Sequence, residues 1–294
     1  MDRALTYWLM SCLQVDPDDP KQVYLGTEHS GLFITKDGGK EWLRANPNVP
    51  CLTLSSLLAV SGKLFAGTMP AALYALSDSG GWQELKGVRS AATGGTFPPN
   101  PDLAARTRVI TSEERAGGRL YAGIEVGGIL ISDDDGRDWS AANDGLEDPD
   151  IHQILPSKKT AGLVLAACGE GVFRSKDRGA HWDKITPQGK RTYGNALAED
   201  DSGTIYLGIT LDRPRTWTRS GRADGAIYKT NDGGKCWEPI VENISGGVMD
   251  ICVEPDGNGV LVATAEGEVL HVDSSASRAV ISGLPCVTAL ARGA

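Results

Sequence analysis

The sequence predicts an all-β protein, a single β-propeller with six four-stranded antiparallel blades, and a seven-bladed ring is the alternative. The spacing Ser/Thr-x-Asp-x-Gly-x-x-Trp recurs without a gap at four places, which begin at Thr35, Ser132, Ser175 and Thr230. A shortened copy lies at 77–82, and residues 270–275 keep the preceding apolar run but lack the Trp. Repeats at a period of roughly 40 to 55 residues are typical of propellers or solenoids.

Each copy of this motif is interpreted as the corner between two strands. The apolar residues before it favour a strand, whereas Asp and Gly favour a turn. Trp then opens the next strand with a side chain large enough to fill the gap between neighbouring sheets. We therefore expect the Asp residues to be structural, with a calcium or surface role as the alternative.

Every repeat can be written as four strands, A to D, with the corner between C and D. Each A strand is apolar and follows a connection, and each B strand follows a polar turn such as Asp16-Pro-Asp-Asp-Pro20. The first three blades are expected at about 9–47, 50–87 and 106–143, with strands at 11–15, 23–26, 31–34 and 42 onward; 52–60, 63–67, 73–76 and 82–85; and 108–112, 120–124, 129–132 and 139 onward.

The same pattern continues through the second half. Residues 284–294 look like one further A strand, which would close the ring or begin a seventh blade. All blades belong to one predicted domain, 1–294, because single blades cannot bury both faces. The last three are expected at about 150–187, 193–242 and 247–283, with strands at 152–155, 163–167, 172–175 and 182–185; 195–198, 205–209, 227–230 and 237–240; and 248–253, 260–264, 269–272 and 279–282.

Composition fits this fold and restricts the partners. Thirty-seven Gly and fifteen Pro suit many short strands joined by turns, and 40% hydrophobic residues allow a large core. The net charge of -9 argues against a general nucleic-acid or anionic-membrane surface, and no apolar stretch is long enough to span a membrane.

Cysteine usage bears on the compartment. Six Cys without a CxxC pair indicate reduced thiols, and hence a cytoplasmic protein. Leu9-Met-Ser-Cys12 loosely resembles a lipoprotein cleavage box, so export is the alternative.

The segments 16–27 and 31–42 resemble the BNR or Asp-box repeats of sialidases, sortilin-type receptors, xyloglucanases and the photosystem II stability/assembly factor with its bacterial relatives. The resemblance covers nearly the whole chain and implies a propeller with Asp-box turns. It does not select one function, because the family includes glycosidases, receptors and assembly factors. The Arg-Ile-Pro segment typical of sialidases is absent from the first blade, and the xyloglucanase resemblance implies two propellers where this chain has one.

Loop lengths indicate the working face. The two longest irregular stretches are Gly87 to Arg106 and Thr210 to Ala226, and both should emerge on the face opposite the corner motifs. The second is an Arg-rich insertion that could clamp a carboxylate, sulfate or phosphate. The predicted substrate-binding residues are Arg108, Arg213, Arg215, Trp217, Arg222 and Asn195.

Titratable residues on the same face suggest chemistry. His residues move protons near neutral pH and bind divalent metals, often together with carboxylates. The predicted catalytic residues are His152, His29, Tyr193 and Glu125, and the residues for a possible divalent metal are His29, His152 and Glu28. No HExxH-type spacing supports the metal.

Two functions therefore remain open. The first is an enzyme of hydrolase or lyase type that acts on a small anionic or sugar-like molecule at the channel mouth. The second is a non-catalytic ligand- or protein-binding scaffold that uses the same loops. A compact polar pocket with converging His and Glu would favour the enzyme, and a wide basic or aromatic surface would favour the scaffold.

Overall fold

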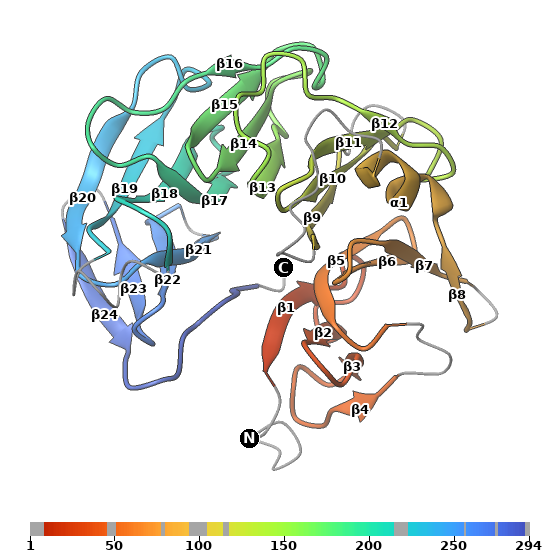
Figure 1. Cartoon of the computed structure of the whole chain (residues 1–294). Coiled ribbons are helices and arrows are strands. Elements are labelled where there is room, and N and C mark those ends of the chain that lie inside the picture. Colours follow the sequence, from red (N-terminus) through yellow and green to blue (C-terminus); the bar gives the residue numbers. More distant parts are fainter. Residues whose placement is uncertain are drawn as a thin grey trace. The chain divides into compact units, whose positions relative to one another are not determined.

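The computed structural model describes residues 9–45, 51–77, 80–93, 105–113, 118–214, 223–255, 257–273 and 276–291. These residues form six sheets, each with four antiparallel strands in sequential order, which are the blades of a six-bladed β-propeller (Figure 1). Each predicted blade is confirmed, with strand ends within a few residues of the predicted ones.

Blades 1 to 3 contain β1 to β12. The bounds are β1 Met10–Val15, β2 Val23–Thr27, β3 Leu32–Thr35 and β4 Leu43–Arg44; β5 Leu54–Val60, β6 Lys63–Thr68, β7 Leu73–Leu76 and β8 Trp82–Glu84; and β9 Thr107–Ser112, β10 Leu120–Ile124, β11 Gly128–Ser132 and β12 Ser140–Ala141.

Blades 4 to 6 contain β13 to β24. The bounds are β13 Ile151–Pro156, β14 Val164–Cys168, β15 Gly171–Ser175 and β16 Asp183–Lys184; β17 Tyr193–Glu199, β18 Ile205–Thr210, β19 Gly225–Thr230 and β20 Glu238–Ile244; and β21 Val248–Val253, β22 Val260–Thr264, β23 Val269–Val272 and β24 Ser277–Ile281.

Two details differ from the sequence expectation. The stretch after Gly87, expected to be irregular, is the helix α1 (Lys86–Thr93), and Val88 buries its side chain completely. The segment 285–291 has the pattern of an inner strand, but the structure assigns no strand there. Instead, Leu284 N donates to Gly267 O (3.1 Å) and Val287 N to Thr264 O (3.2 Å), which ties this segment to blade 6.

The chain consists of two compact units. Unit 1 comprises residues 1–112, 118–141 and 291–294 and contains blades 1 to 3; unit 2 comprises residues 113–117 and 142–290 and contains blades 4 to 6. Within each unit the inner strand of one blade contacts the inner strand of the next. Between blades 4 and 5, for example, Leu165, Val172, Leu197 and Leu207 form one buried cluster. Burial of each such side chain contributes about 1.5–3 kcal/mol, so packing between consecutive blades stabilises each unit.

The corner motifs share one hydrogen-bond pattern. In blade 4, Ser175 Oγ donates to Asp177 Oδ1 (2.7 Å), which also accepts from His181 N (2.9 Å), and Gly179 N donates to Ser175 Oγ (2.7 Å). Equivalent bonds hold the corners at Asp37, Asp134 and Asp232. Because these bonds keep the chain in its turn, Trp182 lies just before its outer strand rather than inside it. Its side chain is buried, and its indole N–H donates to Ala142 O (2.9 Å).

Candidate functional site

The predicted site residues His152, Asn195 and Arg108 share one structural position. Each lies where the pairing of an inner strand with its neighbour shifts by one residue, at a β-bulge. A bulge leaves one residue unpaired and redirects its side chain, and such positions are common beside active sites. On the six inner strands the bulge residues are Ser11, Ser55, Arg108, His152, Asn195 and Met249.

Four of these bulge side chains bond to the next blade. Ser11 Oγ donates to Leu54 O (2.5 Å) and Ser55 Oγ to Thr107 O (2.8 Å) in unit 1. In unit 2, His152 Nδ1 lies 2.6 Å from Gly194 O, and Asn195 Nδ2 donates to Val248 O (2.6 Å). Each acceptor is the residue just before the bulge of the next blade. We call these four contacts the bulge staples. They place His152 and Asn195 in the joints between blades.

His152 is enclosed on every side. Its side chain is 0% exposed, and its ring lies 4.5 Å from that of Tyr193, the first residue of β17. Nδ1 donates to a carbonyl, and the other ring nitrogen, Nε2, lies 3.4 Å from Asp150 Oδ1. The structure thus brings His152, Tyr193 and Asn195 into one region of unit 2. They line the interior there rather than an open pocket.

The predicted residues of unit 1 lie at one end of its blades. Glu125 follows β10 and pairs with Arg106, and Arg108 Nη1 lies 4.0 Å from the same carboxylate. Glu28 follows β2, where its carbonyl accepts from Thr53 Oγ1, and His29 beside it is exposed. Glu125 is therefore paired with Arg106, which was not predicted, and lies close to Arg108, which was predicted to bind the ligand.

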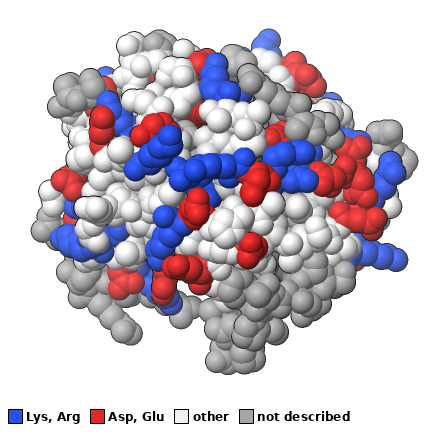
Figure 2. Space-filling view, turned by 90° about the horizontal axis from the view of Figure 1, so that it is seen from above, with Lys and Arg blue, Asp and Glu red and all other residues white. Residues whose placement is uncertain are grey.

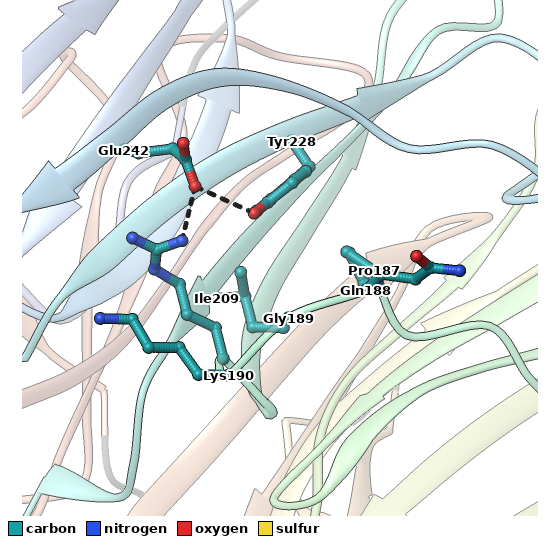
Figure 3. Close-up of a pocket in the computed structure, with 8 residues that line it drawn as sticks. Pro187, Gln188, Gly189, Lys190, Ile209, Tyr228 and Glu242 are labelled. Carbon is teal, nitrogen blue, oxygen red and sulfur yellow. Dashed lines mark hydrogen bonds and ion pairs between the residues drawn. The ribbon is translucent and has the colours of Figure 1, made fainter.

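The most elaborate polar cluster of unit 2 was not predicted. Arg191 precedes β17, and its Nη2 donates to Asp224 Oδ1 (2.8 Å), its Nε to Asp224 O (2.8 Å) and its Nη1 to Glu242 Oε1 (2.7 Å). Lys190 Nζ lies 2.5 Å from Asp224 Oδ2, and Tyr228 OH donates to Glu242 (3.2 Å). Figure 3 shows the two bonds that meet at Glu242, which is the acceptor shared by Tyr228 OH and the guanidinium group of Arg191. We call these five residues the blade-5 anchor.

Electrostatics in the blade-5 anchor favour the charged forms. The hydrogen bonds from Lys190 and Arg191 lower the pKa of Asp224, although burial opposes that shift. Burial also opposes the charge on Arg191, but its bonds to Asp224 and Glu242 raise the pKa of the guanidinium. Breaking a buried pair by removing one partner typically costs about 3–5 kcal/mol. The anchor therefore fixes Asp224 firmly, despite a left-handed backbone there (φ 50°).

Asp224 is the residue at which the Arg-rich insertion returns to the sheet. Arg213 is described and exposed, whereas Arg215, Trp217 and Arg222 lie outside the described residues. Next to the anchor, a cavity of about 140 Å³ is lined by Pro187, Gln188, Gly189, Ile209 and the anchor residues other than Asp224. Small-molecule sites usually measure about 300–1,000 Å³, so this cavity is below that range. Sequence reasoning missed Arg191 and Asp224, since they lie 33 residues apart.

Charges are mixed on the surface. On the face drawn in Figure 2, basic and acidic side chains of the described residues alternate over short distances, so neither sign forms a broad field there. Within the described ranges, no group of three or more His, Cys, Asp or Glu is arranged to hold a metal, and the metal at His29, His152 and Glu28 stays a prediction. No helix in the described part of the chain is long and apolar enough to cross a membrane.

Comparison with known sequences gives two curated relatives. The chain is 35% identical over 80 residues to the photosystem II assembly lipoprotein Ycf48 of Prochlorococcus marinus, which covers 27% of this chain and 23% of that protein. It is 24% identical over 283 residues to the oligoxyloglucan-reducing end-specific xyloglucanase of Emericella nidulans, with 77% of this chain and 33% of that protein covered. The chain thus spans a third or less of each relative. No family model matches it.

Solved structures confirm the fold. A GH74 enzyme of Niastella koreensis superimposes with a TM-score of 0.73 at 14% identity, over 94% of this chain and 45% of that one. Ycf48 bound to a D1 peptide superimposes with a TM-score of 0.63 at 18% identity, over 93% of this chain and 82% of that one. At these identities the likeness shows the β-propeller fold alone. The chain therefore resembles both a group of glycoside hydrolases and a group of assembly factors, as the repeats predicted.

Proposed function

We infer that this chain is a non-catalytic binding propeller that holds an anionic segment of a partner protein at the end of blade 5. One observation carries the proposal. The return of the Arg-rich insertion is fixed by the blade-5 anchor, while the cavity next to it is small and its charges are paired with one another. Such an arrangement positions a loop but leaves little room for a small substrate.

The fate of the predicted catalytic residues supports the same choice. His152 is fully buried and bonded to the next blade, Asn195 is bonded likewise, and Glu125 is paired with Arg106. A general acid or base must come within hydrogen-bond reach of a substrate. The enzyme hypothesis therefore loses the residues in unit 2 on which it depended, and the binding hypothesis keeps the cations of the insertion, of which Arg213 is described and exposed.

The partner chemistry follows from these cations. Arg213, Arg215 and Arg222 lie within ten residues, and the exposed Lys190 side chain lies at the foot of the insertion. Arg guanidinium groups bind carboxylates through paired hydrogen bonds. A solved Ycf48 holds a bound peptide, so a propeller of this kind can serve as a peptide-binding module. We therefore expect an acidic, extended peptide rather than a sugar as the ligand.

Fluorescence anisotropy with a labelled peptide of alternating Glu and Ala tests this. Binding should weaken by about tenfold or more in Arg213→Gln/Arg215→Gln/Arg222→Gln. A hydrogen bond to a charged group contributes roughly 1.5–3 kcal/mol, and an exposed one contributes less. Binding should also weaken with salt. The matched control is Lys40→Gln/Arg137→Gln/Lys235→Gln, which removes three cations from the corner motifs and should bind like the parent.

Equal losses in the two triple variants would reduce the binding to non-specific charge attraction and would contradict the proposal. A turnover assay on xyloglucan oligosaccharides tests the enzyme alternative. Cleavage that His29→Ala or Glu125→Gln abolishes would show an enzyme, and the non-catalytic proposal would be wrong.

A further inference from the structure

The outer strand of blade 6 differs from those of the other blades. The outer strands β4, β8, β12 and β16 have only two or three residues, and β20 carries Pro239, two acidic residues and a left-handed residue, Asn243. Short length, proline, charge and bulges are the means by which proteins protect a sheet edge from pairing with another chain. Strand β24 (Ser277–Ile281) has five residues and neither proline nor acid.

Strand β24 is also exposed along its whole length. All five residues are exposed, including Val280 at 43% and Ile281 at 49%, and Leu284 just beyond is 39% exposed. No Trp anchors this strand, because the sixth corner has lost it. Large apolar side chains beside an unpaired backbone favour the addition of another strand.

The hydrogen-bond pattern shows which backbone groups are available. Asp273 N donates to Ala276 O (3.1 Å), which makes these residues a hydrogen-bonded pair at the turn. In the β23–β24 ladder, His271 pairs with Arg278 and Leu270 with Ala279. Hydrogen-bonded and non-bonded pairs alternate in antiparallel ladders. Ser277 and Ala279 therefore direct their N–H and C=O groups away from β23, toward the open edge.

Charge indicates the occupant. Arg278 lies between these two residues and is exposed, and its side chain makes no hydrogen bond or ion pair with any described residue. A second copy of this chain would bring a second Arg278 to the edge, and like charges that face each other across a strand pair are destabilising. An extended segment of another protein with a carboxylate opposite Arg278 has no such conflict.

We propose that β24 is a strand-addition site, which takes an extended, mainly apolar segment of a partner protein with an acidic residue facing Arg278. Backbone bonds at Ser277 and Ala279 give the affinity, and Val280, Ile281 and Leu284 give apolar contact. A five-residue edge buries much less than the roughly 1,200 Å² of a stable interface, so the complex is weak and transient. This site is independent of the acidic-peptide site at blade 5.

The test is a titration of the isotope-labelled full chain with a blocked peptide of alternating Val and Thr that carries one central Glu, followed by amide NMR. We expect saturable shifts at 277–281. Ala279→Pro should weaken binding by about tenfold, since it removes an outward N–H but no bond to β23. Arg278→Glu should weaken it too, and a peptide with Lys in place of Glu should restore binding to that variant.

Thermal unfolding of each variant checks that the fold is kept, as we expect for Arg278→Glu, a surface change outside the backbone ladder. Three results would overturn the proposal. They are no shifts at 277–281 up to the solubility of the peptide, shifts that Arg278→Glu and Ala279→Pro leave unchanged, and concentration-dependent dimerisation that Ala279→Pro abolishes. The last result would make a second copy the occupant.

Discussion

Blades 4 and 6 share the same four-strand plan but hold their outer strands differently. In blade 4 the complete corner motif places Trp182 against the segment that leads into the blade, where its backbone N–H bonds to Asp144 O (2.9 Å). The outer strand β16 then has only two residues. Blade 6 has neither the Trp nor the motif Gly, and its outer strand β24 is longer and fully exposed.

Blade 6 is instead held from its inner end. Bonds from Leu284, Val287 and Leu290 attach the C-terminal segment to Gly267, Thr264 and Asp250. The comparison teaches that the corner motif fixes the outer end of blade 4. It does not by itself set the length of the outer strand, because blade 5 has the same motif and a seven-residue β20. Where the motif is lost, another segment supplies the stability, and the edge becomes available for binding.

The largest expected effect is in the corner of blade 4. Trp182→Ala should lower the free energy of unfolding by about 3–5 kcal/mol, because it leaves a large cavity and an unpaired Ala142 carbonyl. Urea unfolding measures this. Trp182→Phe is the control, which keeps most of the ring volume and should lose less. A loss below 1 kcal/mol in Trp182→Ala, roughly the effect of a surface change, would mean that the Trp does not stabilise the blade.

The next effect concerns the support of blade 6. Burial raises the pKa of Asp250 to about 6 from the ordinary 3.8, while bonds from Leu290 N and Ile251 N oppose this shift. The folded state then binds more protons than the unfolded state between these values. The stability that protonated Asp250 contributes is fully present below pH 3.8 and is lost as the pH rises to about 6. The loss in the free energy of unfolding is at most about 3 kcal/mol.

Asp250→Asn should remove that loss. Urea unfolding between pH 4 and pH 7 measures the free energy of unfolding of both proteins. The difference, variant minus parent, should rise with pH and become constant above the pKa of about 6. Parallel curves for the two proteins would show that Asp250 does not titrate in this range.

The bulge staples give an intermediate effect inside blade 4. His152→Leu should cost about 1–3 kcal/mol, because the Gly194 carbonyl is left buried without its donor. His152→Asn should cost clearly less, since Asn195 makes the same contact with blade 6. Thermal unfolding compares the two variants. Equal losses would mean that the hydrogen bond contributes little and that ring packing on Tyr193 dominates.

The sequence predicted the fold well because its information is periodic. Apolar runs and corner motifs recur at each blade, and β10 (Leu120–Ile124) and β21 (Val248–Val253) match the predicted ranges to the residue. The helix α1 was missed since it contains Gly87 and adjoins a Gly- and Pro-rich stretch, which local propensity assigns to a loop.

The candidate site was predicted only in part. The sequence placed His152 and Asn195 at the starts of inner strands, which is where they lie. It could not show that each occupies a bulge, because one unpaired residue leaves the alternation of apolar residues almost unchanged. The pair of Arg191 and Asp224 was equally hidden, since it joins a blade connection to the end of an insertion. Periodicity in the sequence locates the strands. A contact between distant residues can be predicted only when the relative positions of those strands are known.

The smallest expected effect separates the two blades most directly. Val172→Ala in blade 4 and Val280→Ala in blade 6 remove the same two methyl groups, but Val172 is fully buried and Val280 is 43% exposed. The first should cost about 2 kcal/mol, and the second should stay within about 0.5 kcal/mol. Urea unfolding of both variants measures the difference. A cost at Val280 as large as at Val172 would mean that the edge of blade 6 is already covered in solution, and β24 would then be part of the core rather than a binding strand.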